Sequence, residues 1–161
     1  MKKLIAIAIL LVTTNAYAGK IIESKGSIDL IKTVNQMTDE VNYYINITST
    51  KGKAIISCSE DSIYLHTKSA KMDVNNNFVE VIIRFDKHQQ ISLNMFTGDY
   101  SLTNLAALFS DDRKFNSVLS SLKTSKKVLV KPNLYKSAAI YEFDLNDFAK
   151  LYNKMVELNS K

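Results

Sequence analysis

The chain has 161 residues and a formal net charge of +5, and 46% of its residues are hydrophobic. A chain of this length can bury one core of ordinary size, and no shift in composition marks a second domain. The small positive excess is spread along the sequence without a basic stripe or stacking aromatic residues, so the composition argues against a nucleic-acid-binding protein.

Residues 1–18 have the layout of a secretory signal peptide. Lys2 and Lys3 form the positive start, Leu4–Val12 is an unbroken apolar segment, and a pattern of small residues ends at Ala18. The apolar segment is about half of the roughly 20 residues that a membrane-spanning helix needs. We therefore expect cleavage after Ala18, a bacterial or phage origin, a periplasmic location with secretion as the alternative, and no stable membrane span after cleavage.

Strand-like alternation dominates residues 19–161, which we expect to fold as a single β-rich domain. Along Val41–Ser49, apolar and aromatic residues alternate with polar ones at the period of two that half-buried strands show. Phe78–Phe85 and Ile91–Phe96 repeat this alternation on either side of the polar turn Asp86–Gln90. The other candidate strands are shorter: Ser27–Val34, Ala54–Cys58, Ser62–Thr67, Leu102–Phe109, Val128–Val130 and Ala138–Phe143.

Two segments change to the helical period. In Asp111–Thr124 the apolar residues recur at i, i+3, i+4 and i+7, Ser110 is the predicted N-cap, and acidic residues in the first turn suit the helix dipole. Asn146–Leu158 extends the same spacing to i+8, so each helix has one apolar stripe. The sequence predicts a mostly-β α+β fold, an antiparallel β-sandwich-like domain with two flanking amphipathic helices, one of them C-terminal.

Three polar residues lie around the junction of the last predicted strand and the last predicted helix: Asp144, Asn146 and Asp147. Asp144 or Asn146 is predicted to cap the helix, and Asp147 to lie in its first turn, where negative charge is favourable. A structural role is therefore favoured for all three. The alternative is a hydrolase that uses Asp86, Asp144 or Asp147, which requires two of these carboxylates in one accessible cleft.

No pattern in the sequence indicates a cofactor, a metal site or a catalytic residue. His66 and His88 belong to no ligand-spaced cluster, the glycines are isolated, and no serine lies in a nucleophile-elbow pattern. Cys58 is the single cysteine, so no disulfide can form within the chain. We interpret Cys58 as a small buried residue, with a reactive thiol or a disulfide to another molecule as the alternatives.

Four residues are candidates for contact with a partner: Tyr44, Tyr64, Arg84 and Asp86. Tyr44 and Tyr64 fall on the polar faces of their strands, where tyrosine suits a protein interface. The alternative is that a second packed sheet covers both rings. Arg84 and Asp86 share a strand face two residues apart, which favours a local ion pair at the strand end over contact with another molecule.

Four segments, in their order along the chain, resemble the VasI-type family of small periplasmic proteins associated with type VI secretion. The segments are an acidic, threonine-containing turn before a strand, a strand with a cysteine before an acidic turn, an arginine-x-aspartate strand end, and a closing Phe-Asp-Leu strand. The matching residues are Thr38, Asp39, Glu40, Cys58, Arg84, Asp86, Phe143, Asp144 and Leu145. The resemblance spans roughly Ser27 to Leu158. It implies a distant member of the family with a mostly-β domain and flanking helices, and it supplies no active site.

Export and the β-rich pattern favour a non-enzymatic protein-interaction domain that binds an envelope or secreted protein, as the family resemblance implies. The alternative is a periplasmic inhibitor, immunity or exclusion factor encoded by a phage or a mobile element. Neither function is expected to need a cofactor, a metal ion or nucleic acid.

Overall fold

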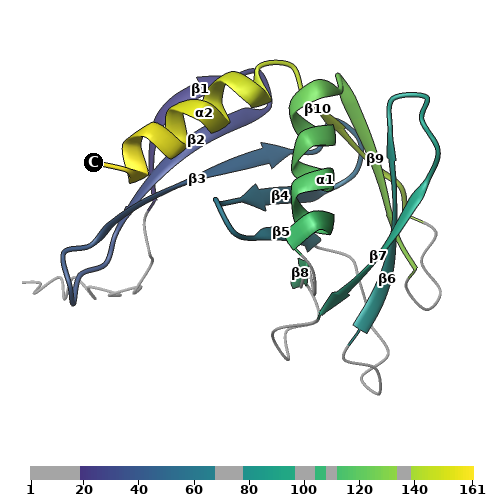
Figure 1. Ribbon diagram of the computed structural model, residues 1–161, viewed down its shortest axis with the longest axis horizontal. Helices are drawn as coiled ribbons and strands as arrows, with labels where there is room; N and C mark the ends of the chain where they lie inside the picture. Colours follow the sequence, from purple (N-terminus) through teal and green to yellow (C-terminus); the bar gives the residue numbers. More distant parts are fainter. Residues whose placement is uncertain (1–18, 68–77, 97–103, 108–111, 134–138) are drawn as a thin grey trace, which may run out of the picture.

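The computed structural model describes residues 19–67, 78–96, 104–107, 112–133 and 139–161. These residues form ten strands and two helices (Figure 1). In chain order they are β1 Lys20–Lys25, β2 Ile28–Val34, β3 Val41–Thr48, β4 Ala54–Cys58, β5 Ile63–Thr67, β6 Phe78–Phe85, β7 Ile91–Phe96, β8 Asn104–Ala107, α1 Asp112–Thr124, β9 Lys127–Pro132, β10 Tyr141–Asp144 and α2 Phe148–Asn159.

The strands form one hydrogen-bonded sheet in the order β1-β2-β3-β4-β5-β8-β7-β6-β9-β10. Neighbouring strands are antiparallel throughout, and β1 to β5 follow one another as successive hairpins. The predicted mostly-β α+β class with two helices, one of them C-terminal, is therefore confirmed. The division into two facing sheets is not confirmed, because the ladder is continuous from β1 to β10.

The sheet bends strongly, since β3, β4 and β5 run across Figure 1 whereas β6, β7 and β9 run up it. The bend brings the turn between β3 and β4 into contact with β10. The Thr50 backbone N–H donates to the Glu142 carbonyl oxygen at 2.8 Å, and Lys51 forms an isolated β-bridge with Glu142. The sheet therefore closes on itself at this point, and β1 and β2 extend away from the closed part.

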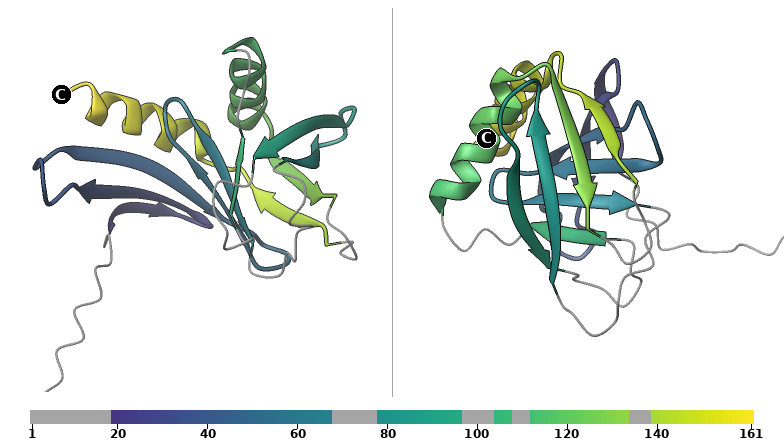
Figure 2. Two further views of the ribbon diagram at one scale, coloured as in Figure 1. Left: turned by 90° about the horizontal axis from the view of Figure 1, so that it is seen from below. Right: turned by 90° about the vertical axis from the view of Figure 1, so that its right-hand side faces the viewer.

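Both helices pack on the same side of the bent sheet (Figure 2). Their predicted apolar stripes are their buried faces, and these faces meet the alternate strand residues that point inward. Removing these side chains from water is the main favourable contribution to folding. The buried side chains of the helices are Val118, Leu119, Leu122, Phe148, Leu151, Tyr152 and Met155.

Most predicted elements agree with the structure, with small shifts at their ends. β4, β6 and β7 have the predicted residues, and both helices begin and end within two residues of the prediction. The strand β1 was not predicted, because Ile21 and Ile22 are adjacent rather than alternating; the ladder has a register shift between Ile21 and Glu23. The predicted N-cap Ser110 lies outside the described residues.

Candidate functional site

A groove of about 880 Å³ lies where β4 ends short of its neighbour β3. β3 has eight residues, but β4 pairs only with its second half, Ile45–Thr48. After Cys58 the chain turns back towards β5, and the Ser59 N–H donates to the Ser62 carbonyl at 2.9 Å. The first half of β3, Val41–Tyr44, therefore borders the groove with no strand on that side.

Asn159, the last residue of α2, occupies part of this strand edge. The Tyr43 backbone N–H donates to Asn159 Oδ1 at 2.9 Å, and Asn159 Nδ2 donates to the Tyr43 carbonyl oxygen at 3.3 Å. A carboxamide carries both a donor and an acceptor, as a peptide group does. The Asn159 side chain thus takes the position that a residue of a neighbouring strand would take.

Aromatic side chains line the groove on the face of the sheet opposite the core. Tyr44 comes from β3, and Tyr64 and His66 come from β5. The Tyr64 and His66 rings stack with their centroids 6.3 Å apart and their planes 21° apart. Tyr44 is half-buried, and this burial raises the pKa of its hydroxyl. Tyr64 is 40% exposed, so it faces solvent and is not covered by a second sheet.

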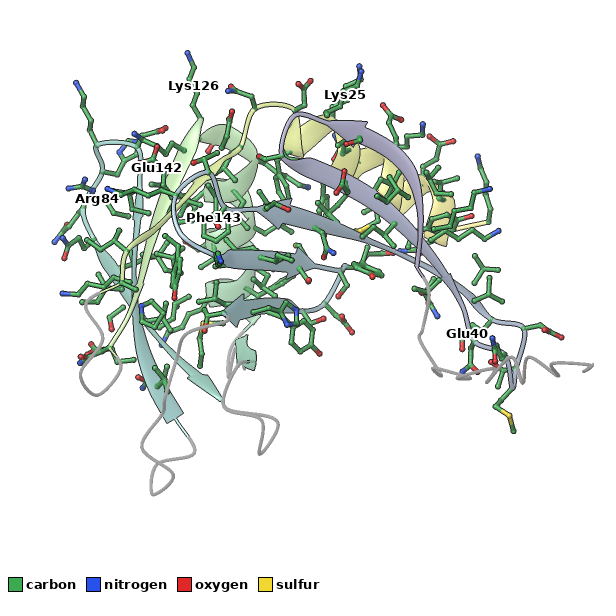
Figure 3. All side chains as sticks on the ribbon, turned by 180° about the vertical axis from the view of Figure 1, so that it is seen from behind. Lys25, Glu40, Arg84, Lys126, Glu142 and Phe143 are labelled. Atoms are coloured by element: carbon green, nitrogen blue, oxygen red, sulfur yellow. The ribbon has the colours of Figure 1, made fainter. Side chains whose placement is uncertain are left out.

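Carboxylates provide the charge of the groove. Glu40 lies at the far end of the β2–β3 hairpin (Figure 3), and Glu60 and Asp61 lie in the β4–β5 turn. The Ser59 hydroxyl donates to Asp61 Oδ1 at 2.8 Å, and hydrogen bonds from Ser59 and then Ser62 lower the pKa of Asp61. No lysine or arginine is among the described residues that line the groove, although the chain is basic overall.

Cys58 lies beside the groove as a buried free thiol with no exposed surface. Burial raises the pKa of Cys58 to about 12. Burial also raises the pKa of the nearby Tyr152 to about 12, with smaller contributions from Cys58, Glu60 and Asp61. The Lys123 ammonium lies 4.2 Å from the centroid of the Tyr152 ring. A thiol that stays protonated at neutral pH supports the interpretation of Cys58 as a structural residue.

Arg84 and Asp86 lie far from the groove, and Figure 3 shows Arg84 and Glu40 at opposite ends of the molecule. Arg84 is exposed on β6. The Asp86 carboxylate accepts the backbone N–H groups of Lys126 at 3.2 Å and Lys127 at 3.0 Å. In the part of the chain that the structure describes, no salt bridge joins Arg84 to Asp86. The prediction of a local ion pair between them is therefore wrong. Asp86 instead holds the β6–β7 turn against the start of β9.

The residues between β10 and α2 also serve the backbone. Asp144 Oδ1 accepts the Asn146 N–H at 2.9 Å, which stabilises the turn before the helix. α2 begins at Phe148, so Asp147 is the N-cap residue and not part of the first turn; it makes no side-chain cap hydrogen bond. None of Asp86, Asp144 and Asp147 lines the groove, so the groove is not the shared carboxylate cleft that the hydrolase alternative requires.

Tyr43, Glu60, Asp61 and Asn159 are among the groove residues that the sequence patterns do not identify. The alternation along Val41–Ser49 puts Tyr43 on the apolar face of its strand, and only its backbone contact reveals the edge. Glu60 and Asp61 read as a short polar turn, and nothing in the helical pattern singles out Asn159. One signal was available, because the predicted strand at Val41–Ser49 is longer than the next one and must leave part of its edge unpaired.

Among the residues that the structure describes, no helix is long and apolar enough to cross a membrane. In the same part of the chain, no group of three or more His, Cys, Asp or Glu side chains is placed to hold a metal ion. Comparison of the sequence and structure with protein-family models, curated proteins and solved structures gives no match.

Proposed function

We propose that this chain is an exported, non-enzymatic protein-interaction domain of the periplasm whose partner binds in the groove beside β3. The observation that carries the proposal is the groove itself, in which Tyr44 and Tyr64 line a hollow next to an unpaired strand edge. Tyrosine is common in protein interfaces because it combines a large apolar ring with a hydroxyl group that forms hydrogen bonds.

Exposed apolar side chains next to the groove support the same proposal. The β2–β3 hairpin keeps Val34, Met37 and Val41 exposed, and Met37 is 92% exposed. Val34 and Val41 lie opposite each other in the ladder, and Val41 also lines the groove. The apolar surface thus continues from the groove onto the hairpin, and contiguous exposed apolar surface of this kind marks interaction sites.

The test is affinity capture from a periplasmic extract with the parent chain and two variants. Tyr64→Ala is expected to weaken partner binding by about 1–3 kcal/mol, because buried interface tyrosines often carry such a share of the binding free energy. Arg84→Ala is the matched control, since Arg84 is also exposed but lies far from the groove. Loss of the partner with Arg84→Ala and full retention with Tyr64→Ala would place the interface on β6 and contradict the proposal.

Export and the family resemblance belong to the same proposal. The pattern of residues 1–18 supports cleavage after Ala18, and the resemblance to the VasI-type family supports a role beside type VI secretion. N-terminal sequencing of the chain from a periplasmic fraction is expected to begin at Gly19, and a chain that retains Lys2 would contradict cleavage. A captured component of a secretion machine would support this role, whereas a captured toxin or phage protein would indicate the inhibitor or immunity alternative.

A further inference from the structure

This inference rests on the proposed function and concerns how the partner binds. The backbone groups of successive strand residues point to alternate sides of the strand. Because the Tyr43 N–H and C=O point to the groove, where Asn159 binds them, those of Val41 point the same way. β4 does not extend as far as either residue. The groove therefore contains a short strand edge, with Asn159 holding one of its two residues.

The residues that line the groove show that it follows this edge. Tyr43 and Tyr44 are adjacent in β3, so their side chains point to opposite faces of the sheet. Both nevertheless line the same groove, together with Tyr64 from the outer side, and the buried Cys58 lies next to it on the core side. A hollow lined from both faces lies beside the strand rather than over one face, which is the position that an added strand would take.

The charges around the edge define the chemistry of the occupant. Glu40 lies before the free end of β3, and Glu60 and Asp61 lie across the groove in the β4–β5 turn. Aromatic rings line the same groove, and the faces of tyrosine rings attract ammonium and guanidinium groups. Because the described residues of the lining include no lysine or arginine to neutralise these carboxylates, lysine or arginine side chains of the occupant would complement it.

We propose that the partner contributes an extended segment with lysine or arginine side chains, which pairs with β3 at Val41 and Tyr43 and displaces the Asn159 side chain. This is strand addition at a sheet edge, in which backbone hydrogen bonds supply affinity and alternate side chains supply selectivity. The Asn159 carboxamide satisfies the Tyr43 backbone until the partner arrives, so this part of β3 is not fully open in the free chain.

Proline substitution at Val41 tests the backbone pairing. Val41→Pro removes the N–H that points to the groove. The hydrogen bonds between β3 and β2 are kept, because that N–H points away from β2. Val41→Ala is the matched control, since it shortens the same side chain and keeps the N–H that points to the groove. The probe is a short peptide of alternating lysine and valine residues. Val41→Pro is expected to bind this peptide at least about fivefold more weakly than Val41→Ala does, which corresponds to the loss of one hydrogen bond.

A second variant tests the displacement of Asn159. Asn159→Ala leaves the Tyr43 groups without a competing partner, so the lysine–valine peptide is expected to bind about five- to thirty-fold more tightly, as the removal of two competing hydrogen bonds implies. Glu157→Gln, on the same helix end, is the control and is expected to leave binding unchanged. Circular dichroism and thermal unfolding confirm that each variant is folded. Weaker binding by folded Asn159→Ala would overturn the displacement.

The charge of the occupant is tested with a matched glutamate–valine peptide and with Glu60→Gln combined with Asp61→Asn. The glutamate peptide is expected not to bind, and the double variant to bind the lysine peptide at least tenfold more weakly. Equal binding of both peptides, or an unchanged affinity in Val41→Pro, would overturn this inference. Retained capture of a periplasmic partner by Val41→Pro, with its loss in Tyr64→Ala, would overturn strand addition and leave the proposed function standing.

Discussion

Gly52 illustrates how one residue without a side chain permits the sheet to close. It lies in the β3–β4 turn with a φ of 88°, in the region that glycine adopts at little cost. A Cβ atom at this position would lie 2.7 Å from the buried Tyr141 ring. Both the backbone conformation and the contact with Tyr141 therefore require glycine.

Substitution by alanine separates these two requirements. Gly52→Ala is expected to lower the free energy of unfolding by about 2–4 kcal/mol, because it combines backbone strain with overpacking against Tyr141. Gly26→Ala is the control, since Gly26 has a φ of 59° but no atom within 4 Å of an added Cβ. At Gly26 the substitution adds backbone strain alone, so the free energy of unfolding is expected to fall by about 1 kcal/mol. Urea unfolding measures both, and equal losses would contradict the role of the Tyr141 contact.

Asp86 is expected to matter for stability and not for chemistry. Asp86→Ala removes the acceptor of two backbone N–H groups and places alanine at a φ of 45°. The expected loss is about 2 kcal/mol of unfolding free energy. Asp86→Asn keeps one oxygen acceptor and a residue that tolerates this conformation, so it should lose less than half as much. Thermal unfolding of the two variants checks this order, and equal losses would contradict it.

At the scale of elements, α2 is held by its buried face. Leu151 has no exposed surface and lies among Phe148, Tyr152 and Met155. Leu151→Ala is expected to lower the unfolding free energy by about 2–5 kcal/mol, as truncation of a buried leucine does. The neighbouring Lys150 is exposed, so Lys150→Ala should change stability by less than about 0.5 kcal/mol. Denaturant titration distinguishes the two, and a small effect of Leu151→Ala would contradict the packing.

The alternation of apolar residues predicted most strands, because each strand has one buried face and the period of two is local. The same reasoning could not predict β1, which has no regular alternation and depends on pairing with β2. It also misplaced the hydrogen bonds around α2. Asp144 bonds the turn and Asp147 adopts a left-handed conformation with a φ of 69°, because the tertiary position of the turn decides these bonds.

The groove could be predicted only in part for a related reason. The positions of Tyr44 and Tyr64 on one face follow from strand periodicity, and the structure brings both to the groove. The contact between Asn159 and Tyr43 joins residues 116 apart in the chain, and no local pattern records such a pairing. The edge exists because β4 stops early while α2 ends beside it, which is a property of the assembled fold.

At the scale of the whole molecule, two buried acidic groups predict lower stability in alkali. The pKa of Cys58 rises from its ordinary value of 9.0 to about 12, and that of Tyr152 from 10.0 to about 12. Between pH 9 and 12 the folded state therefore binds more protons than the unfolded state, so the free energy of unfolding falls as pH rises through this window.

Urea unfolding at pH 8 and at pH 10.5 measures this effect. The parent chain is expected to lose stability between the two values, and Cys58→Ala to lose less, because the unfolded variant has no thiol to ionise. The same slope in both proteins would show that Cys58 does not contribute. The two proteins are compared by the change in unfolding free energy from pH 8 to pH 10.5. This comparison removes the cost of the cavity that the smaller side chain leaves, because that cost is the same at both pH values.

The bridge between the β3–β4 turn and β10 has a consequence for the time course of folding. The Thr50 hydroxyl contacts the Glu142 carbonyl across 92 residues of chain. Sheets built on such distant pairings fold in milliseconds to seconds, because a long loop must be ordered before the contact forms. The sheet cannot close until β10, Tyr141–Asp144, is available. A chain delivered from its N-terminus, whether from a ribosome or through a translocation pore, would therefore stay open until β10 has been delivered.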